Sequence, residues 1–227
     1  MGMKNSEAYN DIIALLRPNS MMAGVVIGIA VVSAGSTLYY LHSKKQTDFY
    51  ESIPVKREAL FRMAIQNSLL VFMIPLVVEE AIEFVVAGRQ ILGGGVFAVG
   101  EAILWYLFIF MATWLTMALA MIMTGNIIVG VLGFGVFATY FPIVLYNIFP
   151  LYAGSFFSTY SGNTADSIYN SITNCLSPVW LGLRGMTNVN NSTATQIKYM
   201  VLLLLWIVVL YVLCQILYGK RPAESAG

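Results

Sequence analysis

The stretch YYLHSKKQTDFYESIPVKREALFR, residues 39–62, is a polar and charged segment that separates two long apolar runs. Five of the chain's 12 basic residues fall within it: Lys44, Lys45, Lys56, Arg57 and Arg62. Because basic residues in short loops are retained on the cytoplasmic side of a membrane, this segment predicts how the chain is oriented. It also has the features of a docking element.

The composition indicates an integral membrane protein. Of the 227 residues, 59% are hydrophobic and only 10% are charged, which is outside the range of soluble globular domains. Five apolar runs reach the roughly 20 residues that a helix needs to cross the hydrocarbon core, where a helix satisfies its own backbone polar groups. We expect an all-α, polytopic transmembrane helical bundle. The predicted spans are about 21–41, 60–88, 96–123, 127–152 and 198–218.

The distribution of basic residues predicts the topology of these spans. Seven basic residues lie in the opening segment and in the tail 219–227, so the loop 42–59 and this tail are expected to be cytoplasmic. Five spans then place the polar N-terminal segment 1–20 and the loop 153–197 outside. A polar N-terminus that crosses without a signal is unusual. We therefore expect either that a short tail crosses by itself or that a first helix is missing from a six-helix domain, and the ending at 224–227 suggests a cut chain.

The first predicted span carries small residues at helical spacing. Gly24 and Gly28 are four residues apart, as are Ala30 and Ala34. Small side chains let two helix backbones approach closely within a membrane. We expect one face of this span to form a close helix contact.

Four carboxylates fall within the predicted spans. Glu79, Glu80 and Glu83 lie near the far end of the second span, and Glu101 lies near the start of the third. An antiparallel pairing of these two spans would place all four at a comparable depth. Charges within a membrane are costly and usually face a cavity, a partner or the interface. Two interpretations are therefore open: a carboxylate-lined translocation path, or an outer headgroup zone in which water solvates the carboxylates.

The segment 42–59 predicts a docking element followed by the start of a helix. Thr47 or Asp48 can cap a turn that carries Phe49, Tyr50 and Ile53, which together form an apolar knob flanked by charge. Aromatic anchors of this kind concentrate binding energy at interfaces, although Phe49 and Tyr50 could instead rest on lipid headgroups. Next along the chain, a cap at Ser52 and a proline at position 54 predict that the second helix starts near Pro54 and continues into the membrane.

Sequence signatures of catalysis are absent. The chain has no G-x-x-x-x-G-K-[ST] phosphate-binding loop, no H-E-x-x-H pair, since His42 is the only histidine, and no G-x-S-x-G elbow. Cys175 is expected in a loop and Cys214 in a span, so we predict two unpaired thiols and no metal site. The net charge of +1 argues against a nucleic-acid partner. We predict no catalytic residues and no cofactor in this chain.

The segment HSKKQTDFYESIPVKREALF, residues 42–61, resembles a loop of the permease subunits of ATP-binding cassette exporters of the type-2 permease class, particularly those of Firmicutes. That loop carries a phrase of the form D-F-x-x-S-[LI]-P-V-x-R. The matching positions are Asp48, Phe49, Ser52, Ile53, Pro54, Val55 and Arg57. The turn at residues 124–126 and the C-terminal RPAESAG are also similar to this group.

This resemblance implies a coupling helix that fits a groove on a cytoplasmic ATP-binding cassette subunit. The implied docking residues are Tyr50 together with the seven matching positions. It further implies a multi-pass protein of the cell membrane that pairs with a second permease subunit, identical or related, while ATP and Mg belong to the partner subunit.

Two functions follow as expectations. The first is an exporter permease that couples ATP hydrolysis by its partner to translocation of a peptide antibiotic, a lipid or a drug. The second is a secondary transporter or channel that uses Glu79, Glu80, Glu83 and Glu101 as ion or proton ligands.

Overall fold

The computed structural model describes residues 16–87, 92–156, 175–187 and 193–221. Within these ranges the chain is all α-helical, with eight α-helices, one 3-10 turn and one π-helical turn. Three helices are long and apolar enough to cross a membrane: Ser20–Thr37, Gly95–Met123 and Ala194–Lys220. The predicted helical fold class is confirmed, and the three apolar helices support a multi-pass membrane protein.

The described helices follow one another in chain order. Their bounds are Ser20–Thr37 for α2, Lys44–Ser52 for α3, Arg57–Ala87 for α4, Leu92–Met123 for α5, Ile127–Ile143 for α6, Phe149–Phe156 for α7, Pro178–Thr187 for α9 and Thr193–Lys220 for α10. The 3-10 turn η1 spans Tyr39–His42 and the π-helical turn η3 spans Val144–Ile148. Each predicted span is therefore helical for most of its length. Whether α4 and α6 also cross the membrane stays a prediction.

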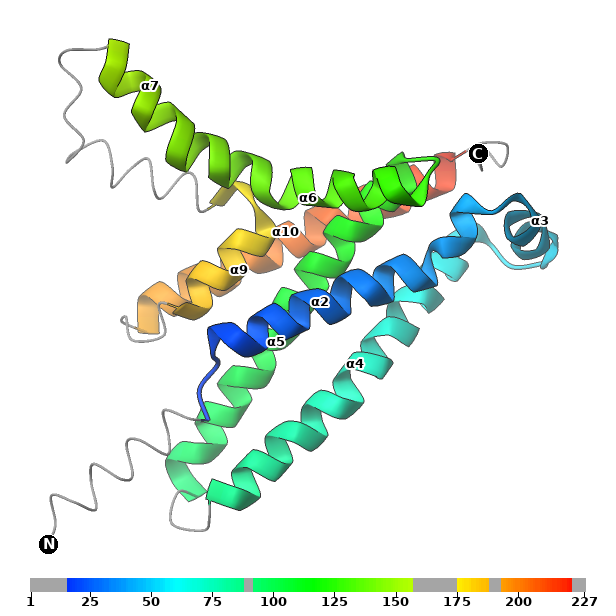
Figure 1. Cartoon of the computed structure of the whole chain (residues 1–227). Helices are drawn as coiled ribbons and strands as arrows, with labels where there is room; N and C mark the ends of the chain where they lie inside the picture. Colours follow the sequence, from blue (N-terminus) through cyan, green and yellow to red (C-terminus); the bar gives the residue numbers. More distant parts are fainter. Residues whose placement is uncertain (1–15, 88–91, 157–174, 188–192, 222–227) are drawn as a thin grey trace, which may run out of the picture.

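Helix α5 is the centre of the bundle. It contacts α2, α4, α6, α9 and α10, which lie around it along its length (Figure 1). In its apolar window 72% of the residues are buried, compared with 22% in α2 and 17% in α10. Because α5 is enclosed by other helices, its large side chains form the core, among them Trp105, Ile109, Phe110, Trp114 and Leu115.

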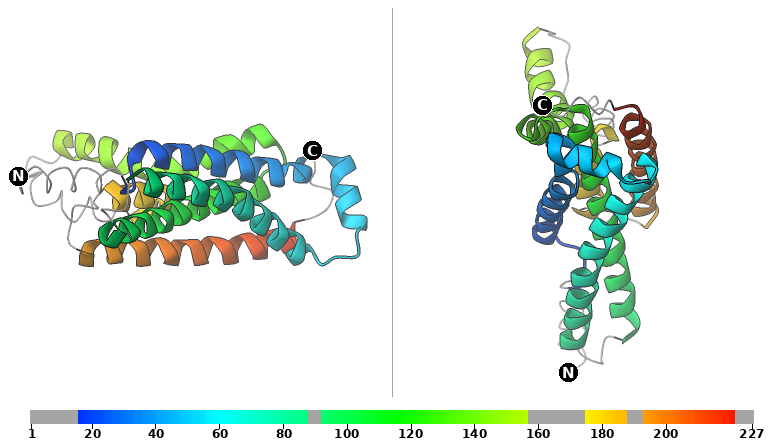
Figure 2. Two further views of the ribbon diagram at one scale, coloured as in Figure 1. Left: turned by 90° about the horizontal axis from the view of Figure 1, so that it is seen from below. Right: turned by 90° about the vertical axis from the view of Figure 1, so that its right-hand side faces the viewer.

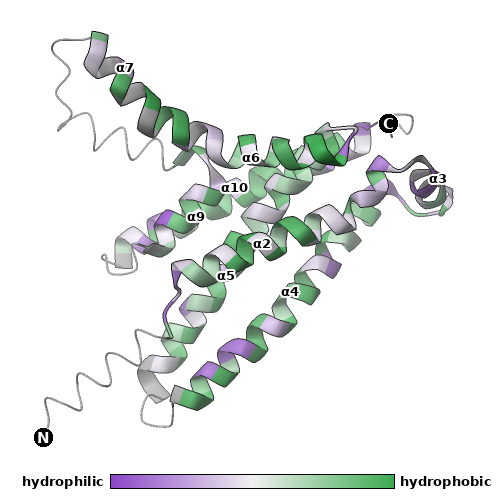
Figure 3. Ribbon diagram, in the orientation of Figure 1, coloured by the Kyte–Doolittle hydropathy of each residue, from purple (hydrophilic) through white to green (hydrophobic). Residues whose placement is uncertain are grey.

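Helices α4 and α5 run antiparallel. The rings of Phe72 and Phe110 stack across the pair, with centroids 4.1 Å apart and planes 5° apart. Aromatic stacking of this kind adds to the energy that ring burial provides. The outer surfaces of α4 and its neighbours are mostly hydrophobic, as expected for helices that face lipid (Figure 3).

The small-residue contact predicted for the first span is half correct. Ala30 and Ala34 are fully buried, and α2 packs closely against α5. Gly24 and Gly28 are exposed, and a side chain at either position would meet nothing within 4 Å. An α-helix has 3.6 residues per turn, so residues seven apart, such as Ala23 and Ala30, share one face, and this is the buried face. Gly24 and Gly28 lie on another face of the helix.

The predicted fourth span, 127–152, is not one regular helix. Helix α6 contains Pro142 and ends at Ile143, where η3 begins, and α7 then continues to Phe156. Proline removes a helix hydrogen bond, and single π-helical turns commonly absorb such a defect. In Figure 1, α7 diverges from the bundle as a result.

The segment 153–197, expected to be an outer loop, contains a packed helix. Helix α9 lies against α5 and α10. Ser177 precedes it, and its hydroxyl donates to the Ala138 carbonyl at 2.7 Å and accepts from the Trp180 amide. Gly185 of α9 allows close packing, since a Cβ there would overlap the ring of Trp105. Within this segment residues 157–174 and 188–192 lie outside the described residues, as do the N-terminal residues 1–15 and the tail 222–227.

Candidate docking helix and the cavity beside it

Helix α3 lies across one end of the bundle, where α2 ends and α4 begins (Figures 1 and 2). The predicted cap at Thr47 or Asp48 is wrong, because the helix starts at Lys44. The Ser43 carbonyl accepts from the amides of Gln46 and Thr47 at 3.0 and 2.9 Å. The Thr47 side chain has another role: its hydroxyl donates to the Tyr40 carbonyl at 2.8 Å and to the Ser43 carbonyl at 3.0 Å. Thr47 is buried and ties α3 to the preceding turn η1.

The two predicted aromatic anchors differ in exposure. Phe49 is 65% exposed and Tyr50 is 37% exposed. Tyr50 packs against Tyr40 of η1, with ring centroids 4.5 Å apart, and meets the edge of Phe49 at 5.7 Å. Phe49 is therefore the more exposed of the two rings, and Tyr50 packs between it and Tyr40.

The remaining predicted docking residues lie in and after the last turn of α3. Ser52, Pro54 and Val55 are exposed, and Ile53 and Arg57 are half-buried. Asp48 belongs to α3, but its side chain lies outside the described part of the structure.

The second helix does not start near Pro54, as the sequence predicted, but at Arg57. The Ser52 hydroxyl donates to the Phe49 carbonyl at 2.7 Å and so completes α3 instead of capping α4. The Lys56 carbonyl accepts from the amides of Ala59 and Leu60 at 2.8 and 3.3 Å at the start of the new helix. Residues 53–56 therefore form a non-helical joint between α3 and α4.

Arg221, just after α10, binds the end of α5 and the turn η1 together. Its Nη1 donates to the carbonyls of Met121 and Ile122 at 2.9 and 3.3 Å. Its Nη2 donates to the carbonyls of Leu41 and Thr124 at 3.1 and 3.0 Å. The last carbonyls of a helix have no hydrogen-bond partner within the helix and carry partial negative charge. A guanidinium supplies both the missing hydrogen-bond donors and an opposite charge.

Two further contacts extend this Arg221 cluster. The Arg221 carbonyl accepts from Nη1 of Arg57 at 2.7 Å, which joins the start of α4 to the end of α10. The hydroxyls of Tyr40 and Tyr218 are hydrogen-bonded, which joins η1 to α10. His42 lies nearby, and its pKa is lowered by burial and also by the positive charge of Arg221. The sequence had indicated Arg221 only as a marker of membrane side.

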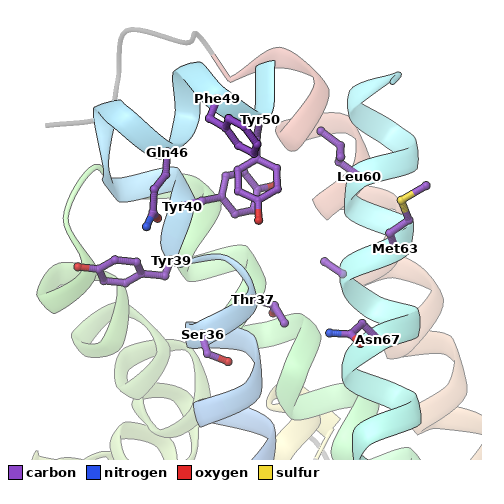
Figure 4. A pocket seen from close by; sticks show the side chains of 11 residues that line it. Ser36, Thr37, Tyr39, Tyr40, Gln46, Phe49, Tyr50, Leu60, Met63 and Asn67 are labelled. Atoms are coloured by element: carbon purple, nitrogen blue, oxygen red, sulfur yellow. The ribbon is translucent and has the colours of Figure 1, made fainter. Parts of the chain in front are cut away.

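A cavity of about 660 Å³ lies beside α3, between the end of α2 and the first turns of α4. Figure 4 shows the side chains around it. Aromatic rings from η1 and α3 form one wall, and α4 forms another. The lining residues are Ser36, Thr37, Tyr39, Tyr40, Gln46, Phe49, Tyr50, Leu60, Met63, Ala64 and Asn67. Asn67 lies in a polar triplet with Gln66 and Ser68, and this triplet was the signal in the sequence that could have indicated the cavity.

The structure brings together three of the four predicted carboxylates. Glu79, Glu80 and Glu83 lie on α4, and Tyr106 of α5 is within electrostatic reach of all three. Glu80 is only 4% exposed, and its Oε2 has no hydrogen-bond partner among the described residues. Glu101 lies on α5, where its Oε1 is also buried without a described partner. Within the described ranges, no group of three or more His, Cys, Asp and Glu side chains is placed to hold a metal ion.

Comparison of the chain with family models, with curated proteins and with solved structures gave no match. The fold and composition define a helical protein with three candidate membrane-spanning helices. Any more specific function is inferred from the end of the bundle that carries α3.

Proposed function

We propose that the chain is the transmembrane permease subunit of an ATP-driven exporter in the cell membrane. The observation that carries this proposal is α3, a short helix across the end of the bundle that exposes Phe49 while its buried side is tied to η1 through Thr47. A surface helix held in this way can receive a partner and pass its movement to the bundle. The α3 end of the molecule then faces the cytoplasm.

In this proposal a cytoplasmic ATP-binding cassette subunit engages Phe49, and ATP and Mg bind to that subunit. Movement of α3 reaches α4 through the joint 53–56. It reaches α10 through the hydroxyl pair of Tyr40 and Tyr218, and α5 through Arg221. The substrate passes between this chain and a second permease subunit, identical or related, and the segment 153–197 forms the outer gate.

The test is to find whether an adjacent reading frame encodes an ATP-binding cassette subunit, to co-express that subunit with this chain, and to measure the ATPase activity of the purified complex. Phe49→Ala is expected to weaken the complex by about 2 kcal/mol or more, the loss typical of a buried aromatic anchor. Phe97→Ala is the matched control, because Phe97 is 83% exposed but lies near the start of α5, at the opposite end. The double variant Phe49→Ala with Tyr50→Ala should abolish coupling. Unchanged assembly and ATPase stimulation in that variant would contradict the docking role.

A second function has its own supporting observation, the buried carboxylate of Glu80. A secondary transporter or channel could use this group as an ion or proton ligand, since intramembrane carboxylates often mark such paths. Purified protein in liposomes would then move its substrate without ATP. Glu80→Gln should stop this movement, and Glu58→Gln is the matched control because Glu58 is exposed near the start of the same helix, away from the four carboxylates. Transport that requires ATP and survives Glu80→Gln excludes this function.

A further inference from the structure

We propose that the cavity between α2, α3 and α4 binds a diacyl glycerophospholipid by its glycerol ester region. This inference does not depend on the chain being a permease. The volume of the cavity, about 660 Å³, is within the usual range for small-molecule sites, roughly 300–1,000 Å³.

The lining offers hydrogen-bond donors without charge. Among the side chains that the structure describes, those that line the cavity include no Lys, Arg, Asp, Glu or His. The hydroxyls of Ser36 and Thr37 donate to carbonyls of their own helix at 3.0 and 2.7 Å. The carboxamides of Gln46 and Asn67 have no described partner, so their N–H groups are available. An ester carbonyl is an uncharged acceptor and matches these donors, and the described lining holds no cation to pair with a phosphate.

The position of the cavity matches the depth of lipid esters. It adjoins the end of α2, a candidate span, and the first turns of α4, next to the basic segment 39–62. Tyrosines such as Tyr39 and Tyr40 are typical of the zone between headgroups and hydrocarbon. A lipid bound there would keep its phosphate outside, on the side of the basic segment.

The apolar wall of the cavity gives the acyl chains a path into the bilayer. Leu60, Met63 and Ala64 of α4 line the cavity. Further along the same helix, Leu70, Val71 and Ile74 are exposed. The chains can therefore follow the surface of α4 from the cavity into the hydrocarbon region.

The site is best tested from the α4 wall, because Phe49 and Tyr50 also belong to the proposed docking helix. The probe is a diacyl phosphatidylglycerol with a photoreactive diazirine beside the ester, added to the purified chain in lipid nanodiscs. Peptide mass spectrometry locates the adducts. We expect labelling within residues 36–67, displaced by unlabelled diacylglycerol. A diether analogue, which lacks the carbonyl acceptors, should compete about fivefold less well, the effect of one neutral hydrogen bond.

Two variants and one control complete the test. Ala64→Phe fills the cavity and should abolish the labelling, while Asn67→Leu should reduce it about fivefold by removing one donor. Val86→Phe enlarges an exposed side chain at the far end of the same helix, away from the proposed acyl path, and should leave the labelling unchanged. Adducts spread evenly over the lipid-facing helices, equal competition by the diether lipid, or labelling that persists in both cavity variants would overturn the proposal.

Discussion

Replacing Arg221 by alanine should destabilise the whole bundle, because its guanidinium joins parts of the chain that are distant in sequence. Four hydrogen bonds from this group reach the carbonyls of Leu41, Met121, Ile122 and Thr124. A hydrogen bond to a charged group contributes about 1.5–3 kcal/mol, but water will replace part of the loss at this half-buried site. We therefore expect a net loss of about 3 kcal/mol rather than the sum of the four bonds.

Thermal unfolding of the purified chain in detergent measures this loss. For a chain of this size, about 3 kcal/mol corresponds to a fall in midpoint of roughly 6–12 °C. Arg221→Lys keeps the charge but not the planar donor fork, so it should recover less than half of the difference. Lys220→Ala is the control, since it removes a neighbouring charge that is exposed. If Arg221→Ala melts within about 2 °C of this control, the reasoning about the Arg221 cluster is refuted.

Other substitutions test single contacts. Thr47→Val removes the two hydrogen bonds from its hydroxyl and should speed amide exchange in α3 severalfold, while leaving exchange in α5 unchanged. His42 has a lowered pKa when folded, so it contributes stability above its ordinary pKa of 6.5, and this contribution is lost as the pH falls below that value. A His42→Asn variant should therefore show a weaker decline of the thermal midpoint between pH 7 and pH 5 than the wild type. Gly185→Ala should cost about 1–3 kcal/mol because the new Cβ overlaps Trp105, whereas Gly24→Ala, which meets open space, should be neutral or stabilising in the same melting assay.

The sequence predicted the helices better than their ends. Long apolar runs mark helices whatever their surroundings, and all five predicted spans are largely helical. The predicted helix caps at Thr47 and Ser52 were wrong because the hydroxyls of these residues donate to other carbonyls. The Thr47 hydroxyl reaches back seven residues to Tyr40, and Ser52 closes α3, so α4 begins later than its proline suggested.

The part of the candidate site that one short segment forms could be predicted from the sequence. The parts that form where distant segments meet could not. Phe49 and Tyr50 could be proposed from the sequence because they are neighbours in one short segment, and their docking role stays a prediction. The partners of Arg221 are 97 to 180 residues away in sequence, so no local pattern indicates them. The cavity likewise forms between segments that are separate in sequence, the end of α2, the helix α3 with its preceding turn, and the start of α4, so no local pattern indicates it. By contrast, the sequence spacing indicates the burial of Glu80. Phe72, Leu76 and Glu80 follow one another at intervals of four residues and therefore lie on the same, buried face of α4.

The place of Arg221 in the chain has a consequence for biosynthesis. Since this residue follows α10, its hydrogen bonds cannot form until all of α10 has left the ribosome and entered the bundle. Until then the carbonyls at the end of α5 and in η1 must be satisfied by water, which leaves that end of the protein loosely held. The end that carries α3 is therefore late to mature, and a nascent chain would not hold Phe49 firmly before residue 221 has been synthesised.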